Sequence, residues 1–469
     1  MRFPLLFKVL ALALLVLMLS AVLMRIGFLV DERQARQGEA QRSVEQSHAG
    51  AQTLIGPWVE QRCVEEWDVV SGEGKDRKLS VERREPTLRR VPDQLVVGAQ
   101  VRSELRTRGL FRIPTYGGPV TLDAAWSAPF AQSPRRERSD SRWACEAPRL
   151  VLAISDVRGL RAAALTLDER PAAVRAGTLS AAYPQGVHAD LPANRPAATA
   201  LQARWQLQLA GTGQLALVPA AEATEWHLSS DWAHPSFGGR FLPERRSISA
   251  GGFEAAWQVS SLATGAPDQL QRGVPLCGGA MGVDGDAYSP PGARAAGCLD
   301  TLSVAFFDPV NPYVLSDRAI KYGLLFVVLT FAAVLLVEAL SGRRVHPIQY
   351  ALVGLGLSLF FLLLLSLSEH LPFAQAYGVA ATACALLLGY YGGHMLGRWR
   401  AGLAFGAGIG LLYGLLYLLL QMEQNALVVG SLALFVVLAA VMVLTRRVDW
   451  YTLFDSWRRS AAVAAPVGR

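Results

Sequence analysis

Few residues of this chain have the types and spacing that catalysis or metal binding requires. His227, Asp231 and His234 are spaced so that a helix would place all three on one face, where they could bind a metal ion. The aromatic and proline residues around them are, however, typical of strand and turn. We therefore interpret these groups as part of an aromatic-rich loop and predict no metal site.

The motifs of the common enzyme classes are absent from the sequence. It contains no G-x-S-x-G, no H-E-x-x-H, no S-x-x-K, no G-x-x-x-x-G-K-[ST] and no C-x-x-C. We therefore predict no catalytic residues, no cofactor and no enzymatic activity. An enzyme acting on envelope polymers stays open as an alternative, but it would need converging carboxylates in an outer cleft, and the sequence names no such pair.

The cysteines suggest crosslinks rather than catalysis. Cys63, Cys145, Cys277 and Cys298 fall in one long polar region, and Cys384 falls in an apolar segment. In an oxidising compartment the first four could form two disulfides, with three pairings allowed. We favour Cys277 with Cys298, because the segment between them is rich in Gly, Pro and Ala and reads as a long loop that a crosslink would restrain. Free buried thiols are the alternative.

Apolar segments of membrane-spanning length form the framework in which these candidate residues lie. The segment from Phe3 to Met24 is nearly continuous Leu, Ala, Val and Met, and as a helix it can cross about 30 Å of hydrocarbon. We interpret residues 1–30 as an uncleaved signal anchor rather than a cleaved signal peptide, because the apolar part is long and lacks an A-x-A site. Five further runs predict a bundle of five transmembrane helices in residues 319–447: 320–340, 348–367, 373–396, 403–420 and 426–444.

The arginines set the predicted orientation. Arginine-rich ends of the apolar runs alternate with the connections 368–372 and 421–425, which contain no Lys or Arg. By the positive-inside rule both termini, including a tail of residues 448–469, are cytoplasmic, and residues 31–318 lie outside the cytosol. In a bacterium this side would be the periplasm and the membrane the cell inner membrane. The same arginines account for most of the net charge of +7, so no nucleic-acid partner is predicted.

The region outside the membrane changes its pattern near Gly56 and Pro57. Residues 31–57 are mostly polar and favour a helical stalk. Residues 58–318 alternate β-branched and aromatic residues with polar ones, which predicts a mainly antiparallel β domain in one or two parts. Seven runs carry the strand pattern: 58–70, 95–106, 150–155, 203–209, 215–218, 225–229 and 253–259. The chain is thus predicted to be an α+β membrane protein.

One segment of the outer region is the best candidate for a partner-binding surface. The stretch from Trp232 to Pro243 is unusually dense in aromatic, Gly and Pro residues for an exposed loop. A turn that defines the fold is the alternative. The candidate binding residues are Trp232, His234, Pro235, Phe237 and Phe241.

A glycine repeat marks the fifth predicted span. Its four-residue spacing lines one helix face and allows a neighbouring helix to approach closely, either within the bundle or in a homo-oligomer. A groove for membrane lipid is the functional alternative. The residues are Gly402, Gly406, Gly410 and Gly414.

Several segments together resemble the CreD family of Gram-negative inner-membrane proteins, from the anchor to about Tyr451. They are L-I-G-P from Leu54, W-A-H-P-S-F-G-G-R-F-L-P from Trp232, G-F-E-A-A-W-Q from Gly252, S-D-R-A-I-K-Y-G from Ser316, H-P-I-Q-Y from His346, L-S-E-H ending at His370 and T-R-R-V-D-W-Y from Thr445. The resemblance implies a role in cell-envelope integrity, in the response to β-lactam or envelope stress under a Cre-type two-component system, and in colicin sensitivity. It brings no catalytic activity. The outer cysteines and the Gly-rich insert at 277–298 are not part of the family pattern.

Together these features favour a non-enzymatic envelope protein whose β domain contacts a periplasmic protein or a cell-wall partner. A lipid or small-molecule transporter is the alternative. A polar cavity in the bundle would favour it, near Gln349, Tyr350, Gln375 and His394. The apolar spans carry no ionisable residue near their middle, which argues against a proton-coupled carrier.

Overall fold

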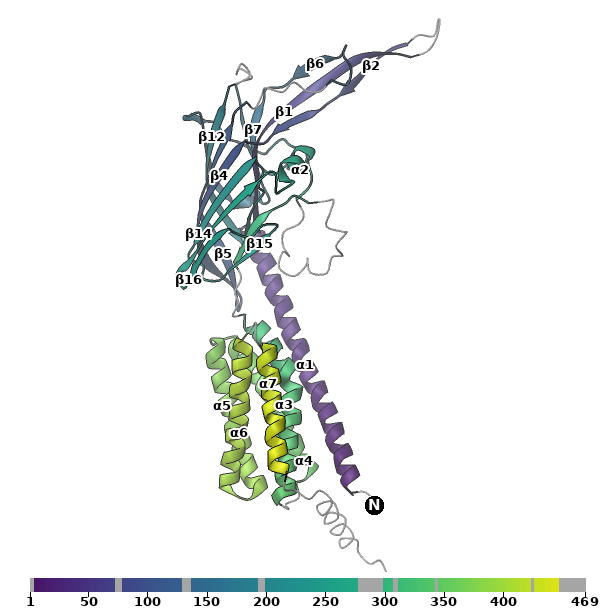
Figure 1. Cartoon of the computed structure of the whole chain (residues 1–469), viewed down its shortest axis with the longest axis vertical. Coiled ribbons are helices and arrows are strands. Elements are labelled where there is room, and N and C mark those ends of the chain that lie inside the picture. Colours follow the sequence, from purple (N-terminus) through teal and green to yellow (C-terminus); the bar gives the residue numbers. More distant parts are fainter. Residues whose placement is uncertain are drawn as a thin grey trace, which may run out of the picture. The chain divides into compact units, whose positions relative to one another are not determined.

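The protein divides into a helical unit and a β unit. The computed structural model describes residues 4–71, 78–128, 136–192, 199–276, 298–306, 311–341, 345–422 and 426–446. The helical unit consists of Met1–Gln37 and Val310–Arg469, and the β unit of Gly38–Pro309 (Figure 1). Residues 448–469, expected as a cytoplasmic tail, lie outside the described residues.

The helical unit contains the apolar helices that the sequence predicts. Five helices in the described part of the chain are long and apolar enough to cross a membrane, one near the N-terminus and four in the C-terminal half. These are α1 (Pro4–Ser47), α3 (Pro312–Ser341), α4 (Pro347–Ser368), α5 (Phe373–Leu396) and α6 (Trp399–Gln421). The mainly apolar α7 (Ala426–Thr445) follows, and its role as a further span stays a sequence-based prediction.

Local signals explain where the helices begin and end. His346 caps α4 by accepting the N–H of Ile348, while the side chain of Gln349 accepts the N–H of His346, which completes a capping box. Gly397 ends α5 in the left-handed conformation that a glycine adopts at low cost. Aromatic rings of neighbouring helices fill the interior of the unit, among them Phe360, which lies 4.1 Å from the ring of Tyr413.

The β unit is a sandwich of two sheets. The first contains ten described strands, seven of them in the order β10 (Arg175–Ala176), β11 (Gly186–Asp190), β7 (Arg149–Ile154), β1 (Gln52–Ser71), β13 (Gln214–Leu217), β18 (Leu302–Phe306) and β15 (Pro235–Gly239). Strand β1 also pairs with β2 (Lys78–Arg84), β3 (Thr87–Arg90) and β6 (Arg142–Cys145). The half of β1 that pairs with β2 and β6 extends away from the other strands of the first sheet as an arm (Figure 1).

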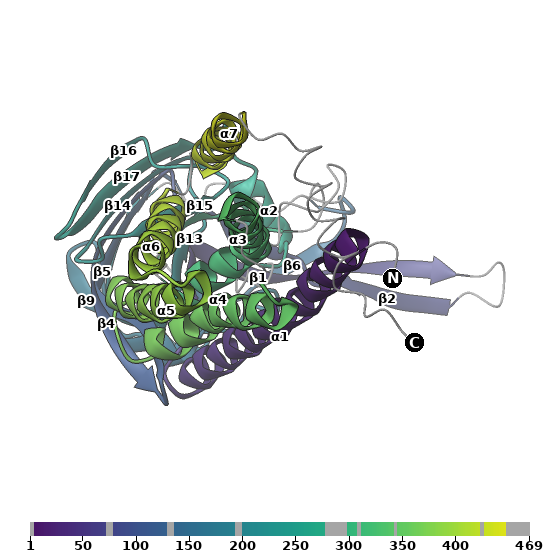
Figure 2. The same ribbon diagram turned by 90° about the horizontal axis from the view of Figure 1, so that it is seen from below.

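The second sheet contains eight described strands and is antiparallel except where β14 pairs with β4. Their order is β16 (Arg245–Ser249), β17 (Gly252–Ser260), β14 (Ala223–Ser230), β4 (Gln94–Arg108), β5 (Phe111–Trp126), β12 (Leu201–Thr212), β8 (Leu160–Leu167) and β9 (Arg170–Ala172). Figure 2 shows the curvature of this sheet from β16 to β9.

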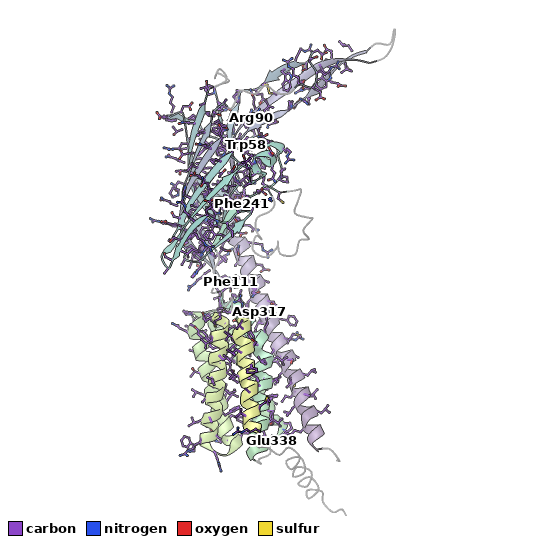
Figure 3. The ribbon with its side chains drawn as sticks, in the orientation of Figure 1. Trp58, Arg90, Phe111, Phe241, Asp317 and Glu338 are labelled. Carbon is purple, nitrogen blue, oxygen red and sulfur yellow. A yellow bond between two sulfur atoms is a disulfide. The ribbon has the colours of Figure 1, made fainter. Side chains whose placement is uncertain are left out.

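Apolar side chains from both sheets meet in one core. Alternate residues of β12, such as Trp205 and Leu207, point inward and are buried, as the strand pattern predicts. A second cluster covers the other face of the first sheet, where Trp58 is fully buried against Tyr183 and the short helix α2 (Ala266–Arg272) (Figure 3). The prediction of a mainly antiparallel β domain is confirmed.

Two boundaries differ from the sequence-based expectation. The helical stalk was expected to reach Gly56 and Pro57, but α1 ends at Ser47 and these two residues lie inside β1. Strand pairing overrides local propensity here, because Gln52–Leu54 pairs with β13 and Leu54–Ile55 pairs with β7. Helix α3 begins at Pro312, so the β domain ends earlier than residue 318.

Candidate functional site

The aromatic segment predicted as a binding surface is largely used in packing. Pro235 and Phe237 lie on the edge strand β15, which pairs with β18. The ring of Phe237 packs edge-on against Trp257 at 5.8 Å, and the carbonyl of Phe241 accepts the indole N–H of Trp257 (Figure 3). Trp232 also packs against the core, whereas His234 is exposed. This packing favours the fold-defining alternative for the aromatic side chains.

A larger polar surface lies on the side of the eight-stranded sheet that faces away from the core. Strand pairing places its side chains in rows that cross the sheet. One row runs through Gln206, Thr121, Gly98, His227, Ala256 and Arg245. A second runs through Gln208, Pro119, Gln100, Ser229, Glu254 and Ser247. We call this surface the outer sheet face.

The outer sheet face is hollowed and carries hydrogen-bonding groups of both charges. Three hollows of about 680, 690 and 440 Å³ lie along it. The first forms over Gly98, which has no side chain, and Ala256, whose side chain is a single methyl group, and His227 and Arg245 also line it. Arg204 and Asp123 form an ion pair across β12 and β5 beside the third. Such a surface suits a hydrophilic partner, because its amide, hydroxyl and charged groups can replace their hydrogen bonds to water with hydrogen bonds to the partner.

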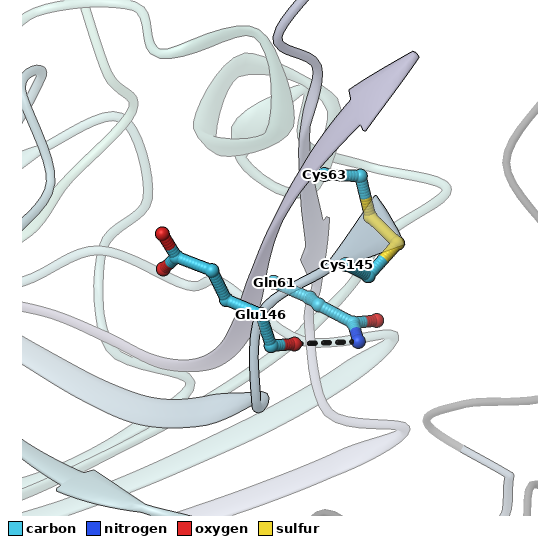
Figure 4. The surroundings of a disulfide bond; sticks show 4 residues. All are labelled: Gln61, Cys63, Cys145 and Glu146. Atoms are coloured by element: carbon cyan, nitrogen blue, oxygen red, sulfur yellow. Dashed lines mark hydrogen bonds between the residues drawn. A yellow bond between two sulfur atoms is a disulfide. The ribbon is translucent and has the colours of Figure 1, made fainter. Parts of the chain in front are cut away.

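The arm formed by β1, β2 and β6 is held together by a disulfide and a buried carboxylate. Cys63 and Cys145 lie opposite each other and form a disulfide, next to a hydrogen bond from Gln61 to the carbonyl of Glu146 (Figure 4). The proposed Cys277–Cys298 bond involves Cys277, which lies outside the described residues, so that pairing stays a prediction. Cys384 is a buried free thiol.

Glu65 is the buried carboxylate of the arm. It accepts hydrogen bonds from the Ser141 hydroxyl (2.6 Å) and the Glu137 N–H (2.8 Å), and it pairs with Arg84 at 3.0 Å. Burial acts to raise the pKa of this carboxyl, but the hydrogen bonds and the arginine outweigh burial and hold the pKa below its usual range. The cluster is therefore a structural charge network that stabilises the ionised form.

Two ion pairs fix α1 to the rest of the helical unit. Lys8 pairs with Glu338, which is only 3% exposed and also accepts the hydroxyl proton of Tyr350 at 2.9 Å (Figure 3). Nearer the other end of the apolar segment, Arg33 lies 3.4 Å from Glu369. In the sequence, the spans carry no ionisable residue near their middle, and nothing identifies which charges at the helix ends form pairs. The only available signal was charge at the ends of different apolar runs.

The glycine repeat is divided between two surroundings. Gly402 and Gly406 pack against Gly389 and Gly393 of α5, so closely that a methyl group on Gly402 would lie 2.5 Å from the Gly393 Cα atom. Gly410 and Gly414 have no heavy atom within 4 Å of such a group. The close contact is therefore internal to the α5–α6 pair, and Gly410 is left on an open surface.

An apolar groove of about 1180 Å³ runs along this open side of α5 and α6. We call it the α5–α6 groove. Leu386 and Leu403 form part of its walls, and His394 and Arg398 lie at one end. Of the residues expected around a polar cavity, His394 lines the groove, whereas Gln349 caps α4 and Tyr350 binds Glu338.

These features define the class as an integral membrane protein with a large β-sandwich domain. In the described residues no three His, Cys, Asp or Glu side chains are placed to hold a metal ion. The profile of the family described as "Inner membrane protein CreD" matches residues 4–451. Inner membrane protein CreD of Escherichia coli (strain K12) is 32% identical over 453 residues, which cover 96% of this chain and 95% of that protein. The chain belongs to the CreD family.

Similarity to solved structures is partial. An M1 zinc metallopeptidase from Deinococcus radiodurans is 15% identical with a TM-score of 0.21, covering 36% of this chain and 38% of that enzyme. Yeast LTA4 hydrolase is 9% identical with a TM-score of 0.18, covering 34% and 25%. The chain thus spans well under half of either enzyme, and likeness at this level carries no argument about activity.

Proposed function

We propose that this protein acts without catalysis in cell-envelope integrity or in the response to envelope and β-lactam stress. In this proposal the β unit binds a hydrophilic periplasmic protein or cell-wall partner through the outer sheet face. The observation that carries the proposal is the combination on one sheet of a buried inner face and a broad, hollowed, polar outer face. A sheet face that contacted only water would not need three hollows side by side.

We further propose that both termini are cytoplasmic and that residues 31–318 are periplasmic. The arginine distribution supports this orientation through the positive-inside rule. The Cys63–Cys145 disulfide supports it independently, because such bonds persist in oxidising compartments and are rare in the cytosol.

The binding proposal is tested by blocking the outer sheet face in cells. Gln206→Trp and Gln100→Trp would add bulk at exposed positions on two rows of the face. Arg175→Trp is the matched control on the first sheet, where Arg175 makes only an exposed ion pair. We expect the first two variants, at normal protein amounts, to fail to restore β-lactam tolerance to a strain lacking the protein, while the control restores it. Full restoration by all three would contradict the proposal.

A lipid or small-molecule transporter is the second candidate function, and the α5–α6 groove favours it. If the groove carries cargo, Gly410→Leu should obstruct it. The variant should then fail to restore β-lactam tolerance to a strain lacking the protein. If Gly410→Leu supports growth while Gln206→Trp does not, the function resides in the β unit.

A further inference from the structure

We propose that the α5–α6 groove binds an anionic glycerophospholipid, with an acyl chain along the groove and the phosphate beside Arg398. The inference concerns the helical unit and does not depend on the proposed function of the β unit. It rests on the groove's shape, on the chemistry of its walls and on the position of its charged end.

The groove exists because glycine packing brings two helices together without side chains between them. Gly389 and Gly393 of α5 contact Gly402 and Gly406 of α6 backbone to backbone. The hollow beside this contact is walled by larger side chains that stand out from each helix, including Leu386, which is 70% exposed, and Leu403, which is 62% exposed. Because α5 and α6 are both long and apolar enough to cross a membrane, these exposed walls suit hydrocarbon.

The ionisable groups of the groove gather at one end. Its lining includes Tyr390, His394 and Arg398, all near the connection from α5 to α6, and the remaining lining residues are uncharged. His394 donates from Nδ1 to the carbonyl of Tyr390 (3.0 Å), which orients its ring. Arg398 lies between the C-terminus of α5 and the N-terminus of α6, whose opposite partial charges offset each other, so its guanidinium supplies the positive charge of this end. An anionic headgroup matches this end, and basic pockets between transmembrane helices are a recognised mode of binding such headgroups.

The length of the apolar part fits a lipid tail. From Ala381 to His394, α5 rises about 20 Å at 1.5 Å per residue. One leaflet contributes about half of the roughly 30 Å hydrocarbon core, so a chain entering beside Arg398 can lie wholly within the groove. Trp399, 70% exposed, stands at the same end, where an indole ring favours the headgroup level.

The test uses the full-length protein in vesicles of phosphatidylcholine and phosphatidylglycerol. A trace of phosphatidylglycerol carrying a photoreactive diazirine in its acyl chain is crosslinked, and labelled peptides are mapped by mass spectrometry. Gly410→Leu places a branched side chain in the groove and obstructs it, and Gly408→Leu is the matched control, because both positions have open space but Gly408 does not line the groove. Both substitutions also improve helix propensity, so neither is expected to unfold α6.

We expect peptides of residues 381–410 to be labelled in the wild-type protein and in Gly408→Leu, and we expect their labelling to fall clearly in Gly410→Leu. Arg398→Gln should lower the preference for phosphatidylglycerol over an equally reactive phosphatidylcholine by about fivefold, the effect of one arginine at an anionic surface. Equal labelling of the two glycine variants would overturn the proposal. Labelling of these peptides in the wild-type protein no stronger than that of the other helices would also overturn it.

Discussion

Lys8 of α1 and Glu338 of α3 form an ion pair across 330 residues of sequence, and Glu338 is almost fully buried. Breaking a buried pair leaves one charge without its partner and typically costs about 3–5 kcal/mol. We therefore expect Glu338→Gln to lower clearly the thermal unfolding temperature of the protein purified in detergent. The double variant Lys8→Met, Glu338→Leu should recover part of the loss, because it removes both charges.

The matched control for this pair is Lys321→Gln. Lys321 pairs with Asp317 one helical turn away on α3, and its side chain is 70% exposed. Exposed pairs of this kind contribute about 0.3–0.5 kcal/mol. Equal unfolding temperatures for Glu338→Gln and Lys321→Gln would show that the buried pair does not fix α1.

Glu65 should make the stability of the arm depend on pH. Its pKa is lower in the folded protein than the ordinary value of about 4.5, so the stabilisation is present above pH 4.5 and is lost as the pH falls through the lower folded value. The protection factors of β1, β2 and β6 amides, which are exchange rates corrected for the slower intrinsic exchange at low pH, should therefore fall below pH 4.5.

Glu65→Gln should remove this pH dependence and make exchange in the arm faster at neutral pH. Glu85→Gln is the control, since the Glu85 side chain is 63% exposed and pairs only at the surface with Arg83. Unchanged pH dependence in Glu65→Gln would assign the acid sensitivity of the arm to another group.

The sequence predicts the elements of this fold better than their partners. Apolar length locates the membrane helices, and strict alternation locates β12, in which Trp205 points inward and Gln206 outward. The alternation does not reveal β5, because Gly117, Gly118 and Pro119 interrupt it where the strand pairs with both β4 and β12. Such pairings are decided by tertiary packing.

The candidate site was the least predictable part. The density of aromatic residues predicts Phe237 as a binding residue. Aromatic rings also fill the core between two sheets, and Phe237 packs there against Phe253 and Trp257. The outer sheet face combines residues from six strands, and the most distant of them, Gly98 and Ala256, lie about 160 positions apart in the chain. No local pattern marks it, because each strand contributes only ordinary polar residues.

Two positions of the glycine repeat should respond oppositely to one added methyl group. Gly402→Ala would place a carbon 2.6 Å from the carbonyl oxygen of Gly389 and force α5 and α6 apart. Overpacking of this kind costs about 1–3 kcal/mol. Gly414→Ala meets open space, so the unfolding temperature should stay unchanged or rise. Similar losses in both variants would place the helix contact elsewhere.

The Cys63–Cys145 bond gives a test of compartment. It closes a loop of 82 residues, for which chain entropy predicts about 4.5 kcal/mol of stabilisation. In cells, both thiols should resist alkylation until a reductant is added, and Cys63→Ala should leave Cys145 reactive. Ready alkylation of both cysteines without reductant would contradict a periplasmic β unit.

The most direct measurement is in-cell photo-crosslinking from a photoreactive residue at Gln206, compared with the same probe at Arg175. If the outer sheet face binds an envelope partner, the Gln206 probe should give a discrete adduct with a periplasmic protein or cell-wall fragment. That adduct should disappear in Gln100→Trp. An adduct pattern at Gln206 no different from that at Arg175 would contradict binding through the outer sheet face.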